Sequence, residues 1–343
     1  MSIVFTVIVT IVVFMLIIMI HEFGHFIAAK AVGVTVHEFA IGFGPTIWKK
    51  QGKETLYSLR IFPIGGFCSL EGEDEESNDP GALSSKPAWK RFSVMAAGAA
   101  FNLVTGFIVF VCLVASVPQY PTNTVGGISA AVQNAPAAGI LQAGDEITAF
   151  NGKRIWYYKD LSFLMSTEAD GNPVRLTVKR EGVKQEISVT PVKYQGRYVL
   201  GIDFQTVQMN LGNALKYGVA ETFFMIRLVI YSLLMLITGK VPITEMAGPV
   251  GAGTMIGAAA KESLPDLFNI FALLSVNIGI FNLIPFPALD GGRIFFLLIE
   301  MIRRKPIPPE KEGMIHFAGL VLLMLLMVFI TSSDIYKLFL PKG

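Results

Sequence analysis

The sequence predicts a polytopic α-helical membrane protein with four transmembrane helices. Of its 343 residues, 52% are apolar and only 16% are charged, and the mean hydropathy is +0.56. In typical soluble domains about a quarter of the residues are charged. Four segments are long and apolar enough to cross a bilayer, namely residues 3–29, 92–117, 267–289 and 314–333.

The ends of these segments divide the chain into the predicted parts 1–33, 34–91, 92–117, 118–209, 210–265, 266–302 and 303–343. The formal net charge of +2 gives no indication of a nucleic-acid partner. Cys68 falls in a loop and Cys112 in an apolar helix. The two cysteines therefore predict neither a disulfide framework nor a metal pair.

The first helix, in residues 1–33, ends in a motif that can bind a metal ion. An uncharged run from Ile3 to Ile20 is followed directly by His21, Glu22 and, four residues after the first histidine, His25. A helix puts residues i and i+4 on one face, so both imidazoles can share one ion. Zinc held by two imidazoles and a third ligand keeps a position for water, and a neighbouring carboxylate can take the proton of that water. The alternative is a chance match within a membrane anchor.

The same N-terminal segment has no basic region before its apolar run, so we expect it to be retained rather than cleaved as a signal peptide. The part 34–91 then begins with a glycine-punctuated stretch rich in β formers. We expect it to form a β-hairpin with its turn at residues 49–53. The acidic run 71–79 predicts a solvated loop. His37 and His316 are expected to be packing or interfacial histidines.

The second helix, 92–117, contains small residues that let helices approach closely, among them Gly98 and Gly106. The part 118–209 has ordinary polarity and predicts a separate domain of short strands. Residues 174–180 and 185–189 alternate in polarity around the turn at Glu181-Gly182. Residues 134–153 resemble the bacterial PDZ pattern, which predicts a PDZ domain.

Basic residues predict the orientation of the helices. They gather in the two connections 30–91 and 303–311, which are therefore expected to be cytoplasmic. Both termini and the PDZ domain would then be extracytoplasmic. In the part 210–265, residues 222–238 are short and contain Arg227, so we expect residues 213–238 to form an amphipathic helix that lies at the interface or inserts partly.

The third helix, in residues 266–302, carries a candidate third ligand. Asp290 is the only acidic residue between Asp266 and Glu300, and the preceding Pro285 and Pro287 break the helix. A carboxylate there, at the depth of His21 and His25, would complete a zinc site near the cytoplasmic face. The alternative is a Pro-Gly turn in which Asp290 only caps the next helix. The part 303–343 is expected to hold the fourth helix and a tail.

His-Glu-x-x-His at 21–25 and the segment Asn282 to Gly292 together resemble the site-2 protease family of intramembrane zinc metalloproteases, in particular the bacterial regulator-of-sigma-E protease-like group. The resemblance implies Zn2+ held by His21, His25 and Asp290, with Glu22 as the catalytic acid/base. It implies substrate-handling roles for the following residues: Asn102, Asn282, Pro285, Pro287, Gly65, Gly66 and Phe67. Residues 98–102 match the second-helix motif except that alanine replaces its proline.

The family resemblance also implies how the protein works in the cell. The hairpin would be associated with the membrane near the zinc, where its strand edge could hold an unwound substrate by strand addition. The expected substrates are single-pass transmembrane proteins, such as anti-sigma factors or signal-peptide remnants, already cut by another protease. The PDZ domain would exclude substrates that still carry large outer domains. The expected location is the bacterial inner membrane, in contact with lipid.

Two other functions are compatible with parts of the sequence. A membrane-tethered PDZ adaptor or chaperone with a non-catalytic metal site would explain the separate domain, but not the glutamate beside both histidines. A metal transporter would need a polar path across the bilayer, and the predicted spans hold few ionisable residues.

Overall fold

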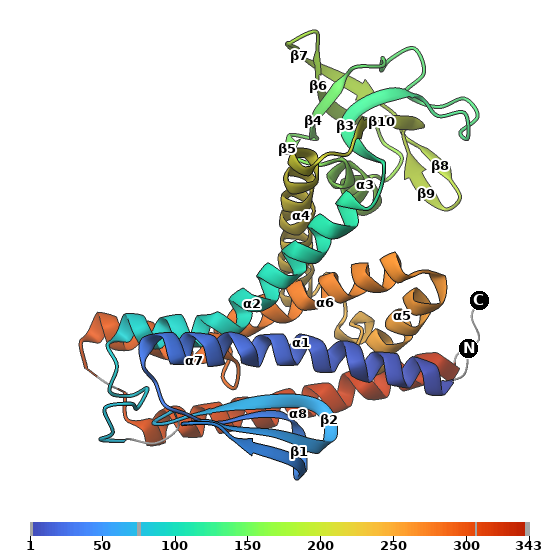
Figure 1. Ribbon diagram of the computed structural model, residues 1–343. Coiled ribbons are helices and arrows are strands. Elements are labelled where there is room, and N and C mark those ends of the chain that lie inside the picture. Colours follow the sequence, from blue (N-terminus) through green and yellow to red (C-terminus); the bar gives the residue numbers. More distant parts are fainter. Residues whose placement is uncertain (1–2, 74–76, 306, 340–343) are drawn as a thin grey trace. The chain divides into compact units, whose positions relative to one another are not determined.

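The computed structural model describes residues 3–73, 77–305 and 307–339 (Figure 1). The chain forms two compact units. Unit 1 comprises Met1–Val109 and Ile226–Gly343, and unit 2 comprises Phe110–Met225. Unit 1 contains the whole of α1 Ile3–Val32, α5 Pro249–Glu262, α6 Leu264–Leu283, α7 Asp290–Arg303 and α8 Pro309–Phe339. Two further helices, α2 Ala88–Ala115 and α4 Leu211–Ile237, belong partly to unit 1 and partly to unit 2. A single 3-10 turn, Ile243–Glu245, precedes α5.

Close backbone contacts hold α1 against its neighbours. A Cβ at Gly24 would lie 2.5 Å from the carbonyl oxygen of Ala97, so only a glycine lets α1 and α2 touch at this level. Nearer the start of α1, Val13 and Ile17 pack with Ile256 of α5. The candidate site follows these two residues, on the part of α1 that includes Gly24.

Among the described residues, five helices are long and apolar enough to cross a membrane, whereas four were expected from the sequence. The additional one is α4, which begins at Leu211 and runs for 27 residues. At 1.5 Å per residue such a helix is about 40 Å long, enough to span the hydrocarbon core. Residues 222–238 are therefore only part of α4, whose bounds nearly match the helix expected over 213–238, and length alone does not prevent this helix from spanning. Its location at the interface stays a prediction.

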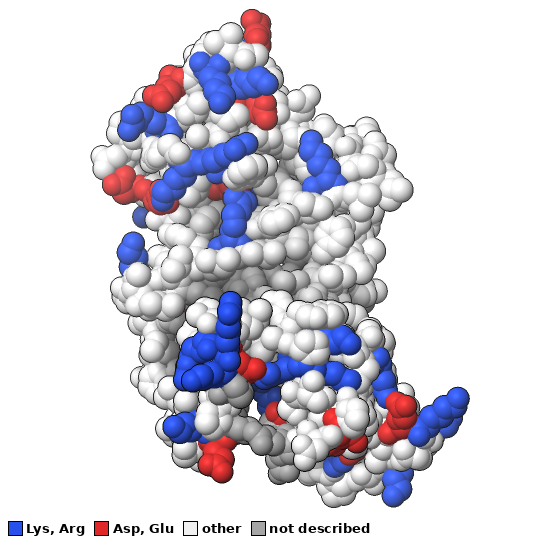
Figure 2. All heavy atoms as spheres, turned by 90° about the vertical axis from the view of Figure 1, so that its left-hand side faces the viewer, with Lys and Arg blue, Asp and Glu red and all other residues white. Residues whose placement is uncertain are grey.

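The basic ends of several helices of unit 1 lie together. Arg91, at the start of α2, forms an ion pair with Glu300, near the end of α7, with 2.8 Å between Nη1 and Oε1. Figure 2 shows Lys and Arg side chains gathered at this end of unit 1, in the lower half of the view. Two basic connections on the same side of the membrane would place their charged residues at one end of the helix bundle, which agrees with this arrangement. The side of the membrane on which they lie stays a prediction.

A long antiparallel pair, β1 Val36–Gln51 and β2 Leu56–Leu70, follows α1. Its register shifts repeatedly, as the glycines in both strands allow. The half of the pair that adjoins the turn between β1 and β2 exposes large apolar side chains, among them Ile47, Trp48 and Phe62. Its association with the membrane stays a prediction. Of the acidic run that follows, residues 74–76 lie outside the described residues.

Unit 2 contains the strand-rich domain, residues 118–209. Its strands are β3 Gln119–Ile128, β4 Glu146–Phe150, β5 Lys153–Arg154, β6 Val174–Arg180, β7 Val183–Val189, β8 Val192–Tyr194, β9 Arg197–Val199 and β10 Ile202–Gln208. The main sheet has the order β10-β3-β4-β6-β7, with β5 beside β4, while β8 pairs with β9. The helix α3, Tyr158–Glu168, completes the domain.

The core of this domain is apolar and fully closed. Ile147 and Phe150 of β4 pack with Leu176 and Val178 of β6, and all four are inaccessible to solvent. The two strands expected around Glu181-Gly182 are β6 and β7. Both turn residues have a positive φ, the geometry of a tight two-residue hairpin.

Candidate metal centre

His21 and His25 lie on one face of α1, as their spacing requires. Their Nε2 atoms are 3.2 Å apart, and their ring centroids are 4.9 Å apart. His21 is 7% exposed. Two ring nitrogens this close to each other can both direct a lone pair at one shared cation.

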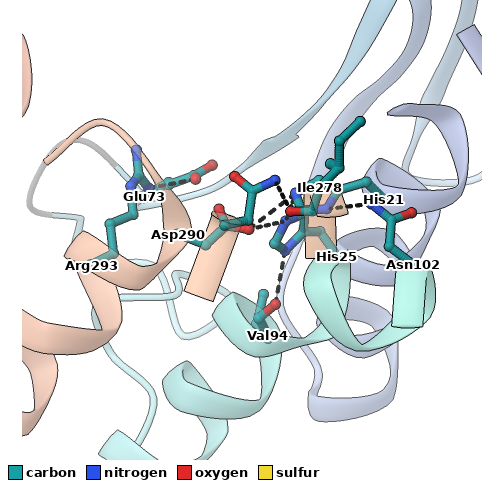
Figure 3. A network of polar contacts seen from close by, with 9 residues as sticks. His21, His25, Glu73, Val94, Asn102, Ile278, Asp290 and Arg293 are labelled. Atoms are coloured by element: carbon teal, nitrogen blue, oxygen red, sulfur yellow. Dashed lines mark hydrogen bonds and ion pairs between the residues drawn. The ribbon is translucent and has the colours of Figure 1, made fainter. Parts of the chain in front are cut away.

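Asp290 comes from the start of α7 and faces both rings (Figure 3). Its Oδ2 lies 3.0 Å from Nε2 of His21 and 3.2 Å from Nε2 of His25. The three ligand atoms all lie within 4.8 Å of one another. Atoms bound to one tetrahedral zinc at 2.0–2.1 Å are about 3.3 Å apart. Oδ2 is also buried and has no hydrogen-bond partner in the part of the chain that the structure describes, so the donor set fits a shared cation.

Groups from α2 hold the far sides of both rings. Nδ1 of His25 donates to the carbonyl oxygen of Val94 at 2.8 Å, which leaves the lone pair on Nε2. Asn102 is fully buried, and its amide group lies 3.4 Å from Nδ1 of His21. Its Oδ1 has no hydrogen-bond partner among the described residues. An Asn102 amide turned the other way would accept a hydrogen bond from the Nδ1–H of His21 and so leave Nε2 as the ligand.

Glycines make room for the site. A Cβ at Gly98 of α2 would lie 2.4 Å from Nε2 of His25 and 2.8 Å from Nε2 of His21. In α7, a Cβ at Gly291 would lie 2.1 Å from the carbonyl oxygen of Ile284. The next residue, Gly292, is in similarly close contact with Phe286. The two glycines after Asp290 thus let the first turn of α7 fold directly onto the preceding loop.

The proline segment brings Asp290 to the site by ending α6. The helix stops at Leu283, and Pro285 and Pro287 prevent its continuation through residues 284–289. Asn282 lies in the last turn of α6, where its Nδ2 donates to the carbonyl oxygen of Ile278 at 3.0 Å. It is partly buried.

The hairpin residues singled out in the sequence lie beside α1. A Cβ at Gly66 of β2 would lie 3.6 Å from the sulfur of Met19, two residues before His21. The adjacent Phe67 stacks on Phe43 of β1, with 6.2 Å between the ring centroids. Gly65 has a φ of +89°, which a side chain would strain. Strand β2 therefore runs past the part of α1 that carries the metal motif.

Glu22 is half-buried and follows His21 directly in α1. His37 pairs with Glu71, in keeping with an interfacial role. His316 of α8 accepts a hydrogen bond from the main chain at Ala288, a contact that nothing in the sequence pattern indicated. The support from Val94 was likewise missed, because it is a carbonyl oxygen and carries no side-chain signal.

Known proteins resemble this chain over nearly its whole length. The family model of peptidase family M50 matches residues 9–326. A Clostridium acetobutylicum protein named as a candidate zinc metalloprotease is 37% identical over 335 residues, covering 96% of this chain and 97% of that protein. The regulator of sigma-W protease RasP of Bacillus subtilis is 30% identical, covering 98% of this chain and 99% of that protein.

A solved PDZ domain from Listeria innocua matches 25% of this chain and 99% of its own length, at 25% identity and a TM-score of 0.22. Fold, site and sequence together define an integral membrane zinc metalloprotease of the site-2 type. The chain belongs to peptidase family M50. The resemblance to the site-2 proteases predicted from the sequence is thereby confirmed, as is the expectation of Zn2+ as cofactor.

Proposed function

We propose that this protein hydrolyses peptide bonds within or next to the transmembrane segments of single-pass membrane proteins, with zinc held by His21, His25 and Asp290. The convergence of these three side chains from α1 and α7 supports the proposal most directly. The motif follows an uncharged helical run of transmembrane length, where ionisable groups are costly unless they have a function.

Zinc, when bound, polarises the scissile carbonyl and lowers the pKa of an attacking water towards about 7. Glu22 takes the proton of that water and returns it to the leaving amine. His25 keeps its Nε2 directed at the site through its bond to Val94. Asn102, with its amide oxygen turned towards Nδ1, orients His21 in the same way.

A transmembrane substrate must be unwound before its main chain can be attacked, because a helix hides its carbonyl groups in its own hydrogen bonds. The passage of β2 beside α1 supports a role for this strand in holding the unwound segment by strand addition. Gly65, Gly66 and Phe67 would then lie next to the substrate, with Asn282 and the loop of Pro285 and Pro287 approaching it from α6.

We assign the strand-rich domain the role of an extracytoplasmic filter and the metal centre a depth near the cytoplasmic face. The basic end of unit 1 supports this orientation. RasP of Bacillus subtilis is named as a regulator of sigma-W, which supports membrane-anchored anti-sigma factors as one substrate class. Such substrates would arrive already shortened by a first protease.

The decisive experiment compares the wild-type protein with Glu22→Gln in the cleavage of a single-pass transmembrane reporter. The variant should keep its zinc but lose activity by about 100-fold or more, since proton transfer is removed and no ligand is. Glu54→Gln is the matched control, because Glu54 is an exposed glutamate paired with Lys30. Undiminished cleavage by Glu22→Gln would remove Glu22 from the mechanism.

A further inference from the structure

Helix α8 contacts the loop that leads to Asp290. Nδ1 of His316 accepts a hydrogen bond from the main-chain N–H of Ala288, at 2.9 Å. Ala288 lies two residues before Asp290, and His316 lies 28 residues further along the chain. The contact therefore joins a transmembrane helix that supplies no ligand to the turn from which a ligand emerges.

Ala288 needs such support because of its backbone conformation. Its φ is +76°, in the left-handed region that residues with a Cβ rarely occupy. Residues held in this region persist where their surroundings determine them, and they concentrate at functional sites. Without an acceptor for its N–H, the turn at Ala288 would also leave a main-chain donor unsatisfied in an apolar bundle.

A second contact on the same face of α8 fixes the loop one residue earlier. A Cβ at Gly319, three residues after His316, would lie 2.5 Å from both the carbonyl oxygen and the Cβ of Pro287. Residues three apart in a helix share a face, so His316 and Gly319 form one surface against the loop. Gly292 of α7 is in similarly close contact with the main chain of Phe286 in the same loop. The loop is thus clamped between α7 and α8.

The ring of His316 is itself held in place. Its side chain is 16% exposed, and its ring lies 5.6 Å from that of Phe296 of α7, centroid to centroid. Nε2 faces Glu312, one turn earlier, at 3.7 Å from Oε1. A proton on Nε2, directed at this carboxylate, leaves Nδ1 as the acceptor that Ala288 requires.

We propose that His316 is a positioning residue that holds the Ala288 turn and thereby sets Asp290 at the distance from His21 and His25 that zinc requires. The inference rests on the proposed role of Asp290 as a ligand. His316 acts through the main chain, two residues from the carboxylate, and touches neither the metal nor the substrate. A side chain that only filled space at this point could be replaced by any ring of similar size.

The test uses the full-length protein in detergent and four variants. His316→Phe keeps a ring but removes the acceptor. His316→Asn is the conservative variant, because its amide oxygen can take the place of Nδ1. Gly319→Ala disturbs the loop at Pro287 instead. Ser332→Ala is the control on α8, since this hydroxyl bonds only within its own helix, to Val328.

Three measurements are made on each variant: zinc affinity by competition with a chelator, the visible absorption spectrum of the cobalt-substituted protein, and kcat and KM on a transmembrane reporter. His316→Phe should weaken zinc binding about 10-fold or more, as loss of a supporting group does. It should also shift the cobalt bands and lower kcat with little change in KM. His316→Asn should restore all three, and Gly319→Ala should change them in the direction of His316→Phe.

Equal effects of His316→Phe and His316→Asn would overturn the proposal, because packing alone would then account for them. So would a rise in KM alone, which would indicate a substrate contact. Should His316→Phe not be recovered as a folded protein, Gly319→Ala decides, and a wild-type zinc affinity there overturns the proposal. Asp290→Ala distinguishes a failure of the metal site from a failure of the positioning role. Unchanged zinc affinity in Asp290→Ala would refute the metal site itself. Lost affinity in Asp290→Ala together with normal affinity in His316→Phe would refute only the positioning role.

Discussion

Gly98 of α2 lies so close to His25 that a Cβ at residue 98 would come within 2.4 Å of Nε2. The atom that would be displaced is the one that faces Asp290 across 3.2 Å. The second helix therefore shapes the metal centre through the absence of a side chain, while Val94, one turn earlier, anchors the other nitrogen of the same ring.

Replacing Gly98 by alanine should empty the metal site and leave the helix intact. Alanine is preferred over glycine inside a helix by roughly 1 kcal/mol, so α2 itself gains from the change. The methyl group would nonetheless displace both imidazoles from the positions that a shared zinc ion requires. We expect zinc content near zero with an unchanged circular dichroism spectrum. Gly313→Ala in α8, where a Cβ meets nothing within 4 Å, is the control and should keep its zinc.

The spacing of His21 and His25 predicted their common face because helical periodicity is local. The approach of Asp290 to these histidines could be inferred only from the similar membrane depth expected for all three residues. The structure brings the three side chains together. The contributions of Val94 and Gly98 depend on where α2 crosses α1. That crossing is set by packing, and a single sequence does not encode it in any periodic pattern.

The ability of α4 to span a membrane was underestimated for a different reason. Lys216 and Glu221 interrupt its apolar run, so the first eleven residues of the helix read as polar. In the structure Glu221 is only 2% exposed and accepts hydrogen bonds from Tyr157 and Lys159 of the strand-rich domain. Tyr157 and Lys159 compensate the burial of this carboxylate within unit 2. Because both are distant in the sequence, the hydropathy of α4 alone gives no indication of them.

Asp290→Ala should lower zinc affinity by more than the roughly 10- to 100-fold loss that follows removal of a merely supporting residue. Two imidazoles would remain, too few for a stable site. Metal content by mass spectrometry after dialysis against a chelator provides the measurement. Asp203→Ala removes an exposed carboxylate from β10 and serves as the control. Equal zinc content in both variants would refute the ligand assignment.

Removing the strand-rich domain should broaden the range of substrates without abolishing the chemistry. The N–H of Met209 donates to the carbonyl oxygen of Pro118 at 3.0 Å, so the two ends meet and a short glycine-serine linker can replace residues 119–208. Glu221→Gln must accompany the deletion, because Tyr157 and Lys159 are lost with the domain and a buried carboxylate would be left unpaired.

The deleted form should cleave reporters that carry a folded outer domain, which we expect the complete protein to reject, and it should cleave short reporters at a similar rate. Glu221→Gln in the complete chain is the matched control and should keep the original selectivity. If the deleted form still rejects the long reporters, the filter lies elsewhere in the molecule.

The last prediction concerns the pH dependence of the strand-rich domain. Asp145 is 1% exposed and accepts two hydrogen bonds from Arg180, at 2.8 and 2.7 Å. Together with the N–H of Gln142, this guanidinium holds the pKa of the Asp145 carboxyl below its ordinary value, although burial alone would raise it. A lowered pKa in the folded state means that the pair stabilises the domain above the ordinary value of about 3.9 and stops doing so as the pH falls through the lower, folded value.

Asp145→Asn should therefore destabilise the domain by about 2 kcal/mol at neutral pH, the scale of hydrogen bonds to a buried charge. This difference from the wild type should stay constant down to about pH 5 and shrink below about pH 4. Hydrogen exchange of the β6–β7 peptide in the full chain measures it, with Asp203→Asn as a control of equal charge change at an exposed site. A difference that persists unchanged at pH 3 would mean that packing at residue 145, rather than its charge, stabilises the turn before β4.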